Sequence, residues 1–167
     1  TADLSELVAE SLRANATAHQ RFGLQIKCHG VDTPTYIETD ANRIIQVLTN
    51  LMSNAAKFSK PGGTVEISVE KTPENVCVSV RDEGMGIAPE DQHKIFQRFA
   101  DMANSDRATK GGTGLGLSIC KAIVEGLGGT IDFVSKEGRG TTFTFTLPVK
   151  TRHSGPENDF ERLENVG

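Results

Sequence analysis

Apolar residues three or four positions apart predict helices in three parts of the chain. The first helix has its apolar face at Leu4, Leu7, Val8, Leu12 and Ala16. The second begins after Asp40 and ends near Ser59, where a Lys, a Pro and two Gly residues follow. The third covers residues 115–127 and ends at a pair of glycines, and a shorter helix is expected from about Pro89.

Apolar residues that alternate with polar ones predict strands between these helices. The strands cover residues 24–28, 65–69, 76–80, 131–133 and 143–147. A strand that alternates in this way buries one face only, so the helices are expected to cover a single side of the sheet. The pattern therefore predicts an α/β fold, a two-layer sandwich with a mixed sheet of about five strands covered on one face by helices.

Two segments have little apolar periodicity. Residues 100–113 are mostly charged or small, which predicts a flexible loop, and residues 150–167 are expected to form a polar tail or linker. Residues 1–149, with the loop at 100–113 among them, suffice for one domain with a buried core. The net charge of −4, without a basic stripe, argues against nucleic-acid binding. The three cysteines form no Cys-x-x-Cys pair and suit a reducing compartment.

Three polar residues of the second helix fall on one face. Asn50 and Asn54 are four positions apart and Lys57 lies three further on, so their side chains project in similar directions. Two amide oxygens suit Mg²⁺, which takes few protein ligands, and an ammonium group suits phosphate oxygens. The alternative is a solvated polar helix face.

Asp82 follows the strand at 76–80 and leads into a turn with Gly84 and Gly86. It has the parity of the apolar strand residues, so its carboxylate is expected on the helix-covered side, where it needs a hydrogen-bond donor. The amine of a purine would be one such donor, and glycines let a flat ring lie close to the backbone. The alternative is a simple turn that ends a strand.

A glycine-rich run opens the third helix. Residues 111–117 contain four glycines, and the free amides and dipole of a helix N-terminus favour phosphate. The run lacks the Gly-Lys-Ser/Thr ending of a P-loop, and it follows a loop instead of the strand that a dinucleotide fingerprint requires. By itself, this run is weak support for a phosphate site.

Taken in order, five motifs resemble the five sequence boxes of histidine kinase catalytic domains. Asn50-x-x-x-Asn54 resembles the N box, and Asp82-x-Gly-x-Gly resembles the first glycine box. Phe96-Gln-Arg98-Phe99 resembles the F box, the Gly-x-Gly-x-Gly run at 112–116 the second glycine box, and Gly138-Arg-Gly140-Thr141 the last one. The resemblance spans residues 1 to about 149. It implies a fold shared with DNA gyrase B and the ninety-kilodalton heat-shock chaperone.

The resemblance also implies a role for each matching residue. Asp82 would bind the adenine amine, Asn54 would bind Mg²⁺ with Asn50 beside it, and residues 100–113 would form a lid over the phosphates. Thr141 or Thr142 would approach the adenine through water. The implied catalytic residues are Asn50, Lys57 and Arg98. The implied nucleotide-binding residues are Asn50, Asn54, Lys57, Phe58, Asp82, Gly84, Met85, Gly86, Ile87, Phe99, Lys110, Gly112, Thr113, Gly114, Leu115, Gly116, Leu117, Thr141 and Thr142.

One position favours a kinase over a hydrolase. The resemblance to gyrase-type ATPases implies a Glu four residues before the metal-binding Asn, and Asn50 stands there instead. An amide cannot take a proton from water at pH 7, whereas an imidazole with a pKa of about 6.5 is already mostly neutral and nucleophilic. The family also implies an Arg at the position of Asp101, and Arg98, Arg107 or Lys110 could substitute for it.

The phosphate acceptor is expected outside this chain. None of the four histidines has the His-Glu/Asp-x-Arg context of an acceptor, and His19 is expected at a surface helix end. The resemblance implies a separate dimerisation and phosphoacceptor helical domain of the same kinase, which serves a response regulator. The chain is expected to be an excised piece, monomeric by itself, and cytoplasmic or the cytoplasmic portion of a membrane-anchored sensor.

Three alternatives stay open. A nucleotide-binding regulatory module without phosphotransfer would carry the same boxes. A gyrase-like ATPase fits less well because of Asn50. A serine kinase of the anti-sigma type shares the implied fold and is usually shorter.

Overall fold

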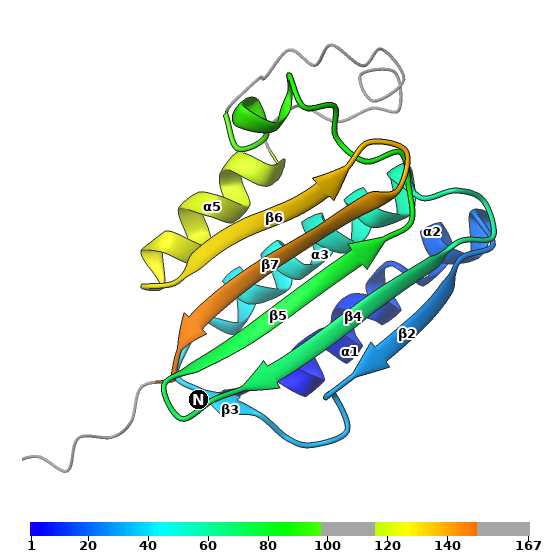
Figure 1. The fold of residues 1–167 in the computed structure, drawn as a ribbon. Helices are drawn as coiled ribbons and strands as arrows, with labels where there is room; N and C mark the ends of the chain where they lie inside the picture. Colours follow the sequence, from blue (N-terminus) through cyan, green and yellow to red (C-terminus); the bar gives the residue numbers. More distant parts are fainter. Residues whose placement is uncertain (98–115, 150–167) are drawn as a thin grey trace, which may run out of the picture.

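A computed structural model describes residues 1–97 and 116–149, in which five strands form one mixed sheet (Figure 1). The strands, in spatial order, are β2 (Gln25–His29), β4 (Thr64–Lys71), β5 (Asn75–Asp82), β7 (Gly140–Pro148) and β6 (Thr130–Lys136). Only β2 and β4 run parallel, and the other three pairs are antiparallel. The α/β fold predicted from the alternating pattern is confirmed.

Among the described residues, the main helices that pack on the sheet cover one of its faces, as Figure 1 shows. They are α1 (Leu4–Ala14), α3 (Ala41–Phe58) and α5 (Gly116–Gly126). Their apolar faces pack against the inward-facing strand residues, which in β5 are Val76, Val78 and Val80. Within residues 1–97 and 116–149, no helix has the length and hydropathy needed to cross a membrane.

The helix boundaries follow from capping residues in the sequence. Asp40 is the N-cap of α3, where its carboxylate accepts hydrogen bonds from the backbone of Asn42 at 3.1 Å and Arg43 at 3.3 Å. Asp3 caps α1 in the same way by accepting from Ser5 at 3.0 Å. The helix α3 ends at Phe58, before Lys60 and Pro61, as predicted.

Several short elements were not predicted. A two-stranded sheet pairs β1 (Ala2–Asp3) with β3 (Tyr36–Ile37), and a separate helix α2 covers Ala16–Arg21. Of the helix expected from Pro89, the described part up to residue 97 forms a 3₁₀ turn at Gln92–Lys94. The segment 100–113 and the tail 150–167 lie outside the described residues, so the predicted lid and the predicted domain boundary stay predictions.

His19 corrects one expectation. It was expected at a surface helix end, but its side chain in α2 is only 5% exposed. Burial lowers the pKa of the imidazole, against a smaller opposing effect of a hydrogen bond with the Met52 backbone. The neutral ring is therefore favoured, and His19 is part of the packing between α2 and α3.

Candidate functional site

The polar stripe of α3 faces away from the helix's deepest contacts. Asn50, Asn54 and Lys57 are all half-buried, and they lie on one side of the helix as their spacing predicts. The core-facing positions of the helix are apolar and nearly inaccessible: Ile44, Val47, Leu48, Leu51, Met52 and Ala55. The helix is thus fixed by its core face, and its polar stripe is presented at the edge of the core.

Helix α5 runs antiparallel to α3 and begins level with this stripe. A Cβ atom placed on its first residue, Gly116, would lie 3.7 Å from the Asn50 Oδ1. Further along α5, the Cys120 thiol lies 3.9 Å from the Val47 carbonyl oxygen. With a rise of 1.5 Å per residue, Asn54 lies about 6 Å and Lys57 about 10 Å beyond Asn50 along the helix axis. Both side chains therefore lie beyond the N-terminus of α5.

Asn50 also contacts the thiol of Cys120. Burial raises the pKa of this thiol to about 11, and a hydrogen bond with the Asn50 side chain lowers it by less. The thiol stays protonated at neutral pH and is unreactive. Asn50 thus contributes to the α3–α5 interface in addition to any contact with a ligand.

Asp82 lies at the end of β5 on the helix-covered side, as its parity predicts. Its side chain is 7% exposed, and its Oδ1 accepts a hydrogen bond from the Gly84 backbone at 2.9 Å. The turn after it is joined to the end of α3, because the Met85 amide donates to the Phe58 carbonyl at 3.2 Å. The carboxylate is therefore held in one place beside the C-terminus of α3.

Glycine is required in this turn because the backbone passes so close to Phe58. A Cβ atom on Gly84 would overlap the Phe58 carbonyl oxygen. Gly86 has a φ of 66°, in the left-handed region that favours glycine, and a Cβ there would overlap the Lys136 carbonyl oxygen. The two glycines that the sequence pattern singled out thus let the turn pack between α3 and the β6–β7 hairpin.

The hairpin between β6 and β7 holds the other side of the turn. The Gly138 amide donates to the Met85 carbonyl at 2.7 Å, and the Ile87 amide donates to the Ser135 hydroxyl at 2.8 Å. Ser135 is itself 2.8 Å from the Thr141 hydroxyl. Residues from 82 to 87 are therefore fixed by the end of α3 on one side and by the hairpin on the other.

The side chains of Thr141 and Thr142 lie on opposite faces of the sheet. Thr141 is directly opposite Asp82 in the β5–β7 register and is 5% exposed, so the two share the helix-covered face. Thr142 is opposite Arg81, on the other face. Of the two candidates for the adenine, the structure therefore brings only Thr141 to the same side as Asp82.

Phe96 connects the F-box segment to the sheet. Its ring lies 5.7 Å from that of Phe133 and 6.3 Å from that of Phe143, with edge contacts in both cases. The Lys121 ammonium of α5 lies 5.5 Å from the Phe96 ring centroid. The other candidate residues between this segment and α5 lie outside the described residues: Arg98, Phe99, Asp101, Arg107, Lys110, Gly112, Thr113, Gly114 and Leu115.

Ser135 and Gln92 were missed by the sequence reasoning. The Gln92 amide donates to the carbonyl oxygens of Ile87 at 3.2 Å and Ser135 at 3.4 Å, so both residues hold the turn. The available signal was the parity of β6, because Ser135 follows Ile131 and Phe133 on inward-facing positions. A polar residue at the last such position indicated a hydrogen-bonding role.

We expect Ser135→Ala to loosen the turn, because the Ile87 amide loses its acceptor. Leaving a partly buried amide unpaired costs about 1 kcal/mol of unfolding free energy. Chemical denaturation and hydrogen exchange of the Ile87 amide measure the two effects. Ser135→Thr keeps the hydroxyl and is expected to restore protection of that amide.

Ser79→Ala is the matched control for this experiment. The Ser79 hydroxyl is 2.9 Å from that of Thr144 on the uncovered face of the sheet, and the bond includes no backbone amide. The control is expected to leave exchange at Ile87 unchanged. Equal exchange at Ile87 in wild type and Ser135→Ala would show that Ser135 does not hold the turn.

Comparison with known proteins gives matches to one family. Residues 39–151 match the family described as histidine kinase-, DNA gyrase B- and HSP90-like ATPase. The chain is 47% identical over 121 residues to the sensor histidine kinase WalK of Bacillus subtilis, with 71% of this chain and 20% of WalK covered. It is 44% identical over 109 residues to the sensor protein SrrB of Staphylococcus aureus, with 65% and 19% covered. The chain thus spans about a fifth of the length of these relatives.

Solved structures show the same fold. The catalytic domain of histidine kinase ThkA has a TM-score of 0.75 and 32% identity, with 89% of this chain and 93% of that domain covered. The mycobacterial sensor histidine kinase MprB has a TM-score of 0.74 and 28% identity, with 88% and 96% covered. The chain therefore belongs to the histidine kinase-, DNA gyrase B- and HSP90-like ATPase family, and within it the chain is similar to the catalytic domains of sensor histidine kinases.

Proposed function

We propose that this domain binds Mg-ATP along α3 and donates the γ-phosphate to a histidine on a separate dimerisation and phosphoacceptor domain. That domain would then serve a response regulator in two-component signal transduction. We place the reaction in the cytoplasm, where ATP is available. In this proposal Asp82 binds the adenine amine, and the N-terminus of α5 lies toward the phosphates.

The observation that carries the proposal is the way α3 joins two different sites. Asn50 lies beside the first residue of α5, and Phe58 lies against the turn of Asp82. Phe58 is eight positions after Asn50, which is about 12 Å along the helix axis, and Asn54 and Lys57 project between these two ends. An elongated ligand that is a flat base at one end and a polyanion at the other is complementary to this arrangement.

The side chains of the stripe also fit a magnesium ion. Asn54 and Asn50 offer neutral amide oxygens, the hard ligands that Mg²⁺ accepts while it keeps several waters. When bound, Mg²⁺ would neutralise charge on the phosphate oxygens. Lys57 would add a fixed positive charge on the same side. Among residues 1–97 and 116–149, no group of three or more His, Cys, Asp or Glu residues forms another metal site.

Asn50 favours transfer to histidine over hydrolysis. Its amide has no basic group for activating water, and its hydrogen bond with Cys120 and its position beside Gly116 hold it within the helix interface. A neutral imidazole needs no base, so the domain only has to position the phosphate and neutralise its charge. The runner-up, a nucleotide-binding module or gyrase-like ATPase without transfer to histidine, would use the same nucleotide contacts.

The deciding experiment supplies the acceptor separately. The domain is incubated with γ-labelled ATP and Mg²⁺, with and without an acceptor-helix domain made from the same full-length protein. We expect label on the acceptor histidine only when this domain and the acceptor-helix domain are both present. We expect very slow release of phosphate by this domain alone. An acceptor with its histidine replaced by Gln is the control. Rapid hydrolysis without acceptor, or binding without transfer, would favour the runner-up.

A further inference from the structure

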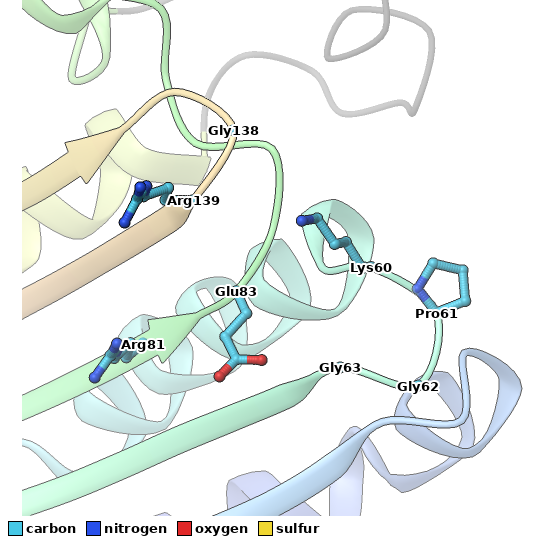
Figure 2. A pocket seen from close by; sticks show the side chains of 8 residues that line it. All are labelled: Lys60, Pro61, Gly62, Gly63, Arg81, Glu83, Gly138 and Arg139. Atoms are coloured by element: carbon cyan, nitrogen blue, oxygen red, sulfur yellow. The ribbon is translucent and has the colours of Figure 1, made fainter.

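A shallow hollow lies where β5 leads into the Asp82 turn, beside the connection that follows α3. It has a volume of about 630 Å³ and is lined by four charged side chains with glycine backbone between them (Figure 2). Figure 2 shows that Arg81 comes from the end of β5, Glu83 from the turn that follows it, Arg139 from the β6–β7 hairpin, and Lys60 from the connection after α3.

The charges around the hollow are unbalanced. Lys60, Arg81 and Arg139 contribute three positive charges, and Glu83 contributes one negative charge. All four are exposed, and within residues 1–97 and 116–149 none of them takes part in an ion pair. A local excess of positive charge on a chain of net charge −4 attracts anions.

Besides Glu83, the acidic residue Glu66 is placed to neutralise Arg81, because the two are directly opposite in the β4–β5 register. Its Oε1, however, lies 2.9 Å from the His29 Nε2. The carboxylate is therefore drawn toward β2, away from the hollow. Arg81 is left to face solvent at its edge.

Three glycine amides that line the hollow are already engaged in hydrogen bonds. The Gly62 amide donates to Phe22, the Gly63 amide to Lys60 and the Gly138 amide to Met85. A ligand would thus be held by the long cationic side chains and not by a nest of backbone amides. This favours recognition by charge, with several anionic groups spread over the hollow.

We propose that this hollow is a second ligand site, for a small multivalent oxyanion that carries phosphate or carboxylate groups. Arg81, Arg139 and Lys60 bind it, and Glu83 limits its affinity. Arg81 and Glu83 flank Asp82 in sequence, and Gly138 is bonded to the turn through Met85. Occupancy therefore alters nucleotide affinity, a consequence that rests on the proposed nucleotide site.

The site is tested by calorimetric titration in metal-free buffer of low salt. Pyrophosphate and tricarballylate are the probes, and the tighter binder assigns phosphate or carboxylate as the preferred group. We expect Arg81→Gln and Arg139→Gln each to weaken binding about fivefold, the factor for one charge near contact in water. Glu83→Gln is expected to strengthen it by about the same factor, and added salt to weaken it.

Arg13→Gln is the matched control, because Arg13 is an exposed residue at the end of α1 that does not line the hollow. Arg13→Gln is expected to leave the affinities for pyrophosphate and tricarballylate unchanged. Equal affinities in wild type, Arg81→Gln and Glu83→Gln, or the same loss with Arg13→Gln, would overturn the site. The opposite signs of the Arg and Glu variants cannot come from loss of folding.

Coupling is measured as the ADP affinity with and without saturating tricarballylate. A change of about twofold or more supports the coupling, and an unchanged affinity overturns it. Failure of ADP to bind in either condition contradicts the proposed function instead, and leaves the anion titration readable by itself.

Discussion

Asp82→Asn is expected to weaken ADP binding about tenfold or more while the domain stays folded. A hydrogen bond to a charged group contributes roughly 1.5–3 kcal/mol, and each 1.4 kcal/mol is a tenfold change in affinity. The amide oxygen of Asn can still accept from Gly84, so the turn keeps the bond seen at 2.9 Å. The amide NH₂, unlike a carboxylate oxygen, cannot accept a hydrogen bond from the adenine amine.

Asp132→Asn is the control for this change of charge. Asp132 is an exposed residue of β6, and its carboxylate accepts from the backbone of Phe133. Calorimetry with ADP and thermal unfolding are measured for both variants. Unchanged ADP affinity in Asp82→Asn would remove Asp82 from the adenine site, whereas equal losses in both variants would indicate a general effect of charge.

The parts of the site that could be predicted are those governed by local periodicity. Val76, Val78 and Val80 alternate with polar residues, so the parity of the strand was enough to put Asp82 on the covered face. The spacing of Asn50 and Asn54 likewise placed both on one side of a helix. These inferences need only the geometry of a single element, which the sequence carries directly.

Contacts between distant segments could not be predicted in the same way. The bond from Met85 to Phe58 joins residues 27 positions apart, and it depends on where β5 ends relative to α3. His19 was expected at a surface helix end, yet the packing of α2 near Met52 buries it. Ser135 was missed because its role depends on the register of β6 and the path of the Asp82 turn.

Gly84→Ala is expected to have the largest effect on stability of the changes considered. The added Cβ would overlap the carbonyl oxygen of Phe58, which belongs to the backbone of α3 and cannot rotate away. The turn must shift, which strains the bonds from Met85 to Phe58 and from Gly84 to Asp82. Such overpacking costs about 1–3 kcal/mol, or roughly 5–10 °C in the unfolding midpoint at the upper end for a chain of this size.

Gly126→Ala gives the opposite sign and serves as the matched control. A Cβ on Gly126 meets no atom within 4 Å, and Ala is favoured over Gly in a helix by up to about 1 kcal/mol. The midpoint temperature of thermal unfolding should therefore fall for Gly84→Ala and stay level or rise for Gly126→Ala. Below its unfolding midpoint, Gly84→Ala should also bind ADP more weakly, because the displaced turn moves Asp82. An unchanged midpoint together with unchanged ADP affinity would show that the Asp82 turn does not rest against the end of α3.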